Sequence, residues 1–261
     1  MPKYDFRSPR LYVKRTLKAG ADLSLEKSQA HYLRNVLRLK PGDGVLVFNG
    51  SDGEWQSSLA EGKPAALSIA EQTRPQTEPI DLHYLFAPLK HERLDYMVQK
   101  AVEMGASRLQ PVLTRHTQVT RVNVERMRAN AIEAAEQCGV LSVPEIAEPV
   151  TFARALAARK PDRLLVFCDE AAEVRDPVAT LADARESPNA MLPLTMSSAG
   201  GGPQPMALLI GPEGGFAEEE RAALLKLTNV VRLSLGPRIL RADTAAVAAL
   251  ALLQSVIGDW R

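Results

Sequence analysis

The second part of the chain alternates short apolar runs with stretches of helical period. Between the apolar runs, the stretch 94–104 places its large apolar residues on one helix face, and Gly105 is positioned to end that helix. A second helix is expected to begin at Asn123 and end at Gly139. Such alternation predicts an α/β domain with a mostly parallel sheet covered on both faces. The expected strands are 82–87, 108–113, 164–168, 206–210 and 230–235.

The first part of the chain has a different pattern. Short strand-like pieces at 45–48 and 55–59 are separated by turns rich in Gly, Asp and Asn, which indicates a small β-barrel. Residues 71–80 carry no apolar period and read as a linker. The predicted domains are therefore 1–72 and 80–261.

The last helix is expected at 244–257 and is apolar nearly all round. A helix of this kind must be buried on more than one side. One face suits the sheet and the other suits a two-fold partner, so a homodimer is predicted. The alternative is a monomer in which other elements cover the helix.

Two strand exits near the C-terminus carry the clearest chemical signal. Both 206–210 and 230–235 run into a Gly-Pro turn and then into a helix-forming sequence. Ligand loops are built in this way at the carboxyl edge of a parallel sheet. The two loops predict one shared pocket, although two ordinary strand-to-helix turns would give the same spacing.

Composition limits the remaining possibilities. An apolar content of 46% in 261 residues supports a substantial core, and the longest apolar run, 245–253, is too short to cross a bilayer. No export signal is visible at the start, which predicts a cytoplasmic protein. Cys138 and Cys168 show no metal-ligand spacing and are expected to be buried thiols. The four histidines never pair at metal spacing, so no metal is predicted.

Although the net charge is only +1, the charged residues are distributed unevenly along the chain. The first forty residues carry ten basic side chains against three acidic ones, with Tyr4, Phe6, Tyr12 and Tyr32 among them. Such a segment can neutralise phosphates and stack on unpaired bases. The alternative is a solvated face with a few core aromatics.

The exact residues of the two Gly-Pro loops resemble the signature of a known protein family. Gly211-Pro212-Glu213-Gly214-Gly215, followed by Leu235-Gly236-Pro237-Arg238-Ile239-Leu240-Arg241, resembles the signature of the ribosomal RNA small subunit methyltransferase E family, within the SPOUT superfamily. Further similarity lies in 99–105, 134–139, 143–145, 33–38 and 41–43, so it covers almost the whole chain. Asp243 stands where that family commonly has Glu, one methylene longer.

The resemblance implies an S-adenosylmethionine-dependent enzyme that methylates N3 of a uridine, position 1498, in 16S rRNA of the small ribosomal subunit. It also implies an N-terminal PUA-like RNA-binding barrel, a C-terminal domain with a deep trefoil knot at about 205–246, and a dimer. Two alternatives stay open. One is a SPOUT ribose 2'-O-methyltransferase acting on tRNA or rRNA, and the other is a non-catalytic RNA-binding assembly factor.

The site residues expected from this resemblance form three groups. The cofactor residues are Ile210, Gly211, Pro212, Glu213, Gly214, Gly215, Leu235, Gly236, Ile239 and Leu240. The RNA-binding residues are Arg7, Arg10, Arg34 and Arg38. The catalytic candidates are Arg238 and Arg241, as cations beside a uracil anion, and Asp243.

Each catalytic candidate also has a structural interpretation. Arg238 and Arg241 would equally serve to brace the loops by pairing with Glu213 or Asp243. Asp243 would equally serve as the N-cap of the last helix, with Thr244 as the rival cap. Asp243 and Glu213 are the candidates for a general base by chemistry alone.

Overall fold

A computed structural model describes residues 7–62, 64–119, 121–173, 175–186 and 204–260 of the protein. The chain divides into two compact units. The first contains Met1–Glu78 together with Ala135–Val143, and the second contains Pro79–Ala134 and Pro144–Arg261. Of the aromatic residues noted in the basic segment, Tyr4 and Phe6 lie outside the described residues.

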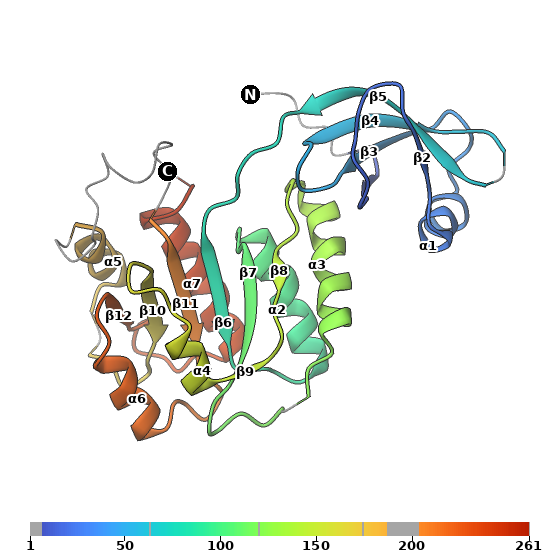
Figure 1. Cartoon of the computed structure of the whole chain (residues 1–261). Coiled ribbons are helices and arrows are strands. Elements are labelled where there is room, and N and C mark those ends of the chain that lie inside the picture. Colours follow the sequence, from blue (N-terminus) through green and yellow to red (C-terminus); the bar gives the residue numbers. More distant parts are fainter. Residues whose placement is uncertain (1–6, 63, 120, 174, 187–203, 261) are drawn as a thin grey trace. The chain divides into compact units, whose positions relative to one another are not determined.

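The first unit is built on a five-stranded mixed sheet in the order β1-β3-β4-β5-β2, which curls on itself (Figure 1). A short helix, α1 (Lys27–His31), runs into a π-helical turn, Tyr32–Val36. Leu33, Val45, Val47 and Leu67 lie in its core and are fully buried. The strands are β1 (Arg10–Tyr12), β2 (Asp22–Ser24), β3 (Gly44–Phe48), β4 (Glu54–Leu59) and β5 (Ala66–Arg74).

A buried charge cluster fixes the start of this sheet. The Nε of Arg10 donates to Glu54 Oε2 at 2.8 Å, and Arg74 donates to the same carboxylate at 2.6 Å. The rest of the Arg10 guanidinium donates to the carbonyls of Ala135, Glu136 and Val140. These bonds hold the segment 135–143 in the first unit, a long-range arrangement that the sequence pattern did not indicate.

Two sequence predictions are wrong here, for the same reason. Arg10 is 6% exposed and its guanidinium is occupied by the buried cluster, so it is not placed to contact RNA. The segment 71–80 is not linker throughout, because β5 continues to Arg74, whose side chain completes the cluster. The polar residues of 71–74 obscured the end of a strand that is exposed on both faces at 70–73.

We expect Arg10→Ala to destabilise the first unit by about 3–5 kcal/mol, because it leaves Glu54 buried with one cation fewer. Burial by itself raises the pKa of Glu54, but the hydrogen bonds from Arg74 and Arg10 outweigh it, and the pKa lies below its ordinary 4.5. The stability from this group is therefore present above pH 4.5 and lost as pH falls through the lower folded pKa.

Denaturant unfolding of wild type and variant between pH 7 and pH 3 measures both effects. Arg34→Ala, whose side chain lies at the surface of the same unit, is the matched control. An equal stability loss for Arg10→Ala and Arg34→Ala would contradict the role assigned to the buried cluster.

The second unit is a parallel α/β layer structure. Its strands are β6 (Leu82–Phe86), β7 (Arg108–Leu113), β8 (Glu145–Ile146), β9 (Val150–Thr151), β10 (Leu164–Cys168), β11 (Met206–Ile210) and β12 (Val230–Leu233). They form the order β12-β10-β11-β6-β7-β8, with β9 paired to β7, and every pair is parallel. The expected strands and their order of appearance are confirmed.

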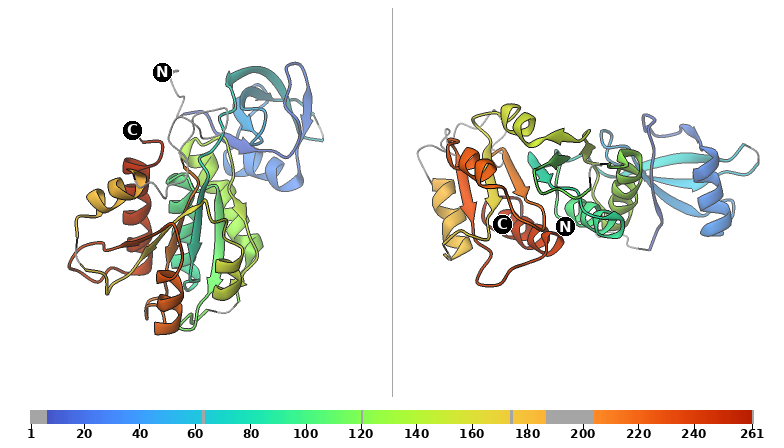
Figure 2. Two further views of the ribbon diagram at one scale, coloured as in Figure 1. Left: turned by 60° about the vertical axis from the view of Figure 1, so that its left-hand side comes forward. Right: turned by 90° about the horizontal axis from the view of Figure 1, so that it is seen from below.

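Helices cover both faces of this sheet, as Figures 1 and 2 show. α4 (Phe152–Ala157) and α6 (Glu218–Leu225) lie over one face, where Phe167, Ala207, Leu209 and Leu224 share a core. On the opposite face α7 (Ala242–Val256) packs against β11 and lies beside α2 (His91–Glu103) and α5 (Pro177–Glu186). Every residue of β11 is buried, as expected for a strand covered on both sides.

Several helix ends follow the predicted signals. In α3 (Val124–Cys138), the side chain of Asn123 accepts from the Arg126 amide at 3.0 Å, and Gly139 follows with φ +78°. The start of α7 differs from the prediction. Its N-cap is Arg241, and Asp243 and Thr244 lie within the first turn, so neither side chain caps the helix. Cys138 is exposed rather than buried.

The strand order places β10 between β11 and β12. After β11 the chain runs through α6 and returns to pair on the far edge of β10. The deep knot at about 205–246 stays a prediction, since pairing order alone does not trace how the chain is threaded.

Candidate functional site

The carboxyl ends of β10, β11 and β12 meet at one edge of the sheet, and their loops enclose a cavity of about 410 Å³. Its walls are the loops 168–170, 210–215 and 233–240, with Ala242 and Ala245 from α7. All the residues predicted to hold a cofactor line this cavity, and so does Arg238. The volume lies within the usual range for small-molecule sites.

The loop 211–215 depends on two of its glycines for different reasons. A Cβ on Gly211 would lie 2.9 Å from the ring of Phe216, which packs edge-on to Phe167 in the core below. Gly215 has φ +71°, and a Cβ there would overlap Glu170 Oε1. The loop therefore closes tightly against the neighbouring 168–170 loop, and its backbone forms the wall of the cavity.

Asp169 anchors the opposite wall. Its side chain is 4% exposed and accepts from Arg221 Nη2 at 2.8 Å and from Arg232 Nε at 2.6 Å. Burial by itself raises the pKa of Asp169, but the bonds from Arg221, the Ala171 amide and Arg232 outweigh it, so the pKa lies below its usual range. These bonds tie β10 to α6 and β12 and fix the shape of the cavity.

The thiol of Cys168 also lines this cavity, but it is not reactive at neutral pH. Burial, and to a smaller extent the charge of Asp169, raises the pKa of the Cys168 thiol to about 12. A thiol with such a pKa stays protonated at neutral pH, so it is not an activated nucleophile.

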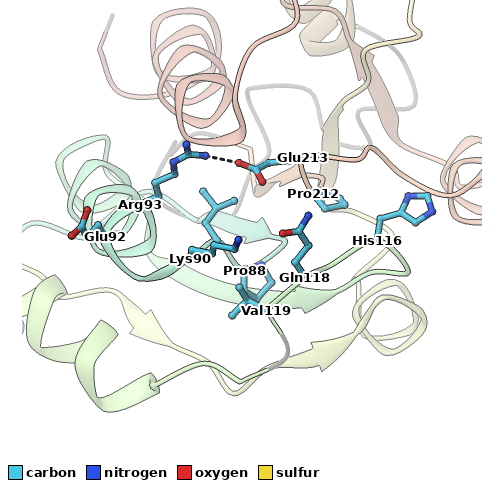
Figure 3. Close-up of a pocket in the computed structure, with 10 residues that line it drawn as sticks. Pro88, Lys90, Glu92, Arg93, His116, Gln118, Val119, Pro212 and Glu213 are labelled. Atoms are coloured by element: carbon cyan, nitrogen blue, oxygen red, sulfur yellow. Dashed lines mark hydrogen bonds and ion pairs between the residues drawn. The ribbon is translucent and has the colours of Figure 1, made fainter.

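Glu213 closes the outer end of the same loop. Its carboxylate is paired with Arg93 of α2 at 2.5 Å (Figure 3). Nearby, His116 Nδ1 lies 3.1 Å from the carbonyl of Gly215. Since a carbonyl only accepts, Nδ1 carries the proton of the neutral ring. Residues that precede the signature loops by about a hundred positions therefore support the first of them.

The comparisons with known proteins agree with this geometry. Residues 76–254 match the model of an RNA methyltransferase domain, and residues 25–69 match that of an RNA methyltransferase PUA domain. The chain is 30% identical to the ribosomal RNA small subunit methyltransferase E of Rickettsia conorii, covering 93% of both chains. It is 31% identical to the protein of that name from Synechocystis sp., covering 91% of this chain and 74% of that protein.

The chain belongs to the ribosomal RNA small subunit methyltransferase E family. A methyltransferase from Legionella pneumophila, solved in complex with SAM, superposes with a TM-score of 0.78 at 28% identity, covering 95% of this chain and 98% of that one. A member from Neisseria gonorrhoeae, bound to S-adenosylmethionine, has the same fold, with a TM-score of 0.79 at 24% identity over 98% of this chain and all of that one. The predicted α/β class with a PUA-like N-terminal unit is confirmed.

The fold brings only some of the catalytic candidates to the lining of the cavity. Arg238 lines it, whereas Arg241 and Asp243 lie beside it at the start of α7. Within the described residues, neither arginine forms an ion pair with Glu213 or Asp243, so the expected bracing of the loops is absent. Glu213 is paired with Arg93 instead.

The remaining RNA-binding candidates of this family member lie in the first unit. Arg7 and Arg38 are exposed, and Arg34 is half-buried with one Nη donating to the carbonyl of Gly62. Tyr32 and Val36, on the same π-helical turn as Arg34, are exposed apolar side chains at 39% and 57%. Together they give the turn a cationic and apolar surface.

Sequence reasoning missed Asp169, Glu170 and Arg93. A signal for the first two was present, because they follow the buried run 164–168 just as the signature loops follow theirs. His116 follows the predicted strand 108–113, a position from which a histidine can face a substrate, although a loop histidine with satisfied hydrogen bonds fits the same pattern. No local signal marked Arg93, and both residues become neighbours of the loop only through the pairing of β6 with β11 and of β6 with β7. Among the described residues, no group of His, Cys, Asp and Glu is arranged to hold a metal ion, and no helix is long and apolar enough to cross a membrane.

Proposed function

We propose that this protein transfers the methyl group of S-adenosylmethionine to N3 of a specific uridine, position 1498, in 16S rRNA of the small ribosomal subunit. The observation that carries the proposal is the cavity lined by both signature loops, 211–215 and 235–240, in a chain that matches the family over nearly its whole length. We further propose that it works in the cytoplasm.

The cavity suits this cofactor. Backbone groups of 211–215 and 235–240 can bind the adenine edge and ribose hydroxyls, because the glycines allow close approach. The exposed carboxylate of Glu170 can balance the positive sulfonium and ammonium groups, and Arg238 is available for the methionine carboxylate. When bound, S-adenosylmethionine supplies an activated methyl whose S–CH₃ bond breaks as the N3–CH₃ bond forms.

The protein contributes alignment and charge. Holding donor and acceptor in line removes much of the barrier, on the order of 7–11 kcal/mol in favourable cases. Uracil N3 must lose its proton, and the negative charge then spreads over the two carbonyl oxygens. Arg241, exposed and without an ion-pair partner among the described residues, is the cation we assign to that charge, with Arg238 as the second candidate.

Mass spectrometry of rRNA nucleosides from a strain lacking this gene tests the proposal. We expect loss of 3-methyluridine, restored by the wild-type gene. Loss of a ribose-methylated nucleoside would instead indicate 2'-O-methylation, and no loss would indicate a non-catalytic RNA-binding factor.

The homodimer is part of the same proposal. One face of α7 carries a half-exposed stripe with Val247, Ala248, Ala251 and Leu252, beyond the face that packs on the sheet. Small residues let two helices approach closely. Sedimentation equilibrium of the wild type and of Ala248→Arg tests this, and a wild-type monomer at micromolar concentration would contradict it.

The first unit is proposed to hold RNA through Arg7, Arg34 and Arg38. Replacing all three by Ala should reduce the slope of log affinity against log salt by roughly 0.7–0.9 for each phosphate that the variant no longer neutralises, with cofactor affinity unchanged. RNA titrations at several salt concentrations measure the slope. A slope equal to that of wild type would assign these side chains to an ordinary solvated face.

A further inference from the structure

A second cavity, of about 470 Å³, lies against the signature loop 211–215 (Figure 3). It is lined by Pro88–Lys90 and by Glu92 and Arg93, where β6 leads into α2, and by His116, Gln118 and Val119, which follow β7. Pro212 and Glu213 complete it. The same two residues also line the cavity assigned to the cofactor, so the two spaces share one wall.

The second cavity continues into a smaller one of about 250 Å³. The two share Leu89, Lys90 and Val119, and the smaller one extends to Arg121 and Arg126 at the start of α3. The two adjacent cavities, here called the groove, thus lie in a row from the shared wall toward the start of α3. All of its lining belongs to the second unit.

Some of the cationic side chains along this groove are paired with carboxylates, and others are not. Arg93 is paired with Glu213, and Arg126 is paired with Asp95 at 2.5 Å. Lys90 and Arg121 form no ion pair with a described residue, and both are exposed. Cations that line a groove without a protein partner suit the phosphates of a nucleic-acid strand.

The side chains nearest the shared wall suit a base. Gln118 is exposed, makes no hydrogen bond with a described residue, and offers both a donor and an acceptor. His116 directs its Nδ1 proton to the Gly215 carbonyl, which leaves Nε2 of the neutral ring as an acceptor. Because N3 of the uracil must face the methyl donor, the side chains of the cavity can bind only the carbonyl oxygens on either side of N3. The Gln118 amide can donate to one of them, and the exposed His116 ring can contact the base.

The location of this cavity beside the cofactor cavity favours it over other surfaces as the site for the methyl acceptor. In-line transfer requires the acceptor atom to approach the methyl donor within about 3–3.5 Å, so the acceptor must enter beside the cofactor cavity. The cavity that shares Pro212 and Glu213 with it lies beside the cofactor cavity and, at about 470 Å³, has room for a base unstacked from the RNA.

We propose that this second cavity receives the target uracil, and that the groove past Lys90 to Arg121 holds the phosphates of the adjoining nucleotides. This inference rests on the proposed function. It names the acceptor site of that reaction, with Gln118 and His116 as base-contacting residues and Lys90 as a phosphate-binding residue.

Two variants test the assignment on unmethylated small subunits purified from a strain lacking the gene. Gln118→Trp fills the cavity, and kcat/KM should fall at least 30-fold. Lys90→Ala removes one charged contact, and kcat/KM should fall about tenfold, mainly through KM. S-adenosylmethionine affinity, measured by calorimetry, should stay within twofold for both, because neither residue lines the cofactor cavity.

Matched controls are Thr228→Trp and Lys226→Ala, both exposed positions between α6 and β12, at the opposite edge of the sheet. They should retain wild-type kcat/KM. If wild type itself makes no 3-methyluridine on these subunits, the proposed function fails. If wild type is active while Gln118→Trp and Lys90→Ala behave like their controls, or lose activity only in proportion to cofactor affinity, the acceptor site lies elsewhere.

Discussion

We expect replacement of Arg241 by Ala to lower the single-turnover rate of methyl transfer by roughly 100-fold, the usual effect of removing one preorganised donor from a developing anion. Cofactor affinity and melting temperature should stay near wild type. The reason for this separation is structural, since Arg241 lies outside the cofactor cavity and makes no ion pair with a described residue. Only the transition-state charge then depends on its guanidinium.

Three measurements on each variant check this expectation: single-turnover methylation, calorimetry of S-adenosylmethionine, and thermal unfolding. Arg241→Lys keeps the charge but loses the fixed fork of donors, so its rate should lie between those of wild type and Arg241→Ala. Arg154→Ala, exposed on α4 on the other face of the sheet, is the matched control. A rate loss fully accounted for by weaker cofactor binding would remove Arg241 from the reaction.

Gly215→Ala should weaken S-adenosylmethionine binding at least tenfold. The new Cβ would overlap Glu170 Oε1, and φ of +71° is unfavourable for alanine, so the loop must shift where it forms the cavity wall. Gly214→Ala is the control in the same loop. Its Cβ would lie 3.6 Å from His116 Cβ, an ordinary contact, at a residue that is not in the positive-φ region.

Calorimetry of both glycine variants, with melting temperature as the check on folding, tests the prediction. The double variant Gly215→Ala with Glu170→Ala, compared with Glu170→Ala alone, separates the two causes, because in that pair the close contact is absent and only the backbone strain differs. Unchanged cofactor affinity in Gly215→Ala would mean that this loop does not shape the binding site.

The strands of the second unit were predictable because parallel strands buried on both faces appear as uninterrupted apolar runs. The strand β11, with every residue buried, is the clearest case. In contrast, the predicted strand ended too early at the polar end of β5, where residues 70–73 are exposed on both faces and a buried carboxylate on another strand holds Arg74. Local polarity cannot report a partner that is distant in sequence.

The same dependence on residues distant in sequence decides which residues of the candidate site could be predicted. The signature loops reveal the cavity because their glycines and prolines carry the geometry in adjacent residues. Arg10 looked like its exposed basic neighbours, and only the fold shows that Glu54 and the carbonyls of 135–140 surround it. Lys90 and Gln118 stand in unremarkable local sequence, and the pairing of β6 with β7 on one side and with β11 on the other brings them to one groove.

Pro212 and Glu213 line both cavities, so we expect occupation of the two proposed sites to be thermodynamically linked. Under such a linkage, whatever factor the cofactor contributes to RNA affinity, RNA must contribute the same factor to cofactor affinity. Transfer removes the sulfonium charge and with it the attraction to the Glu170 carboxylate, so the spent cofactor and the methylated RNA would then weaken each other's binding and leave more readily.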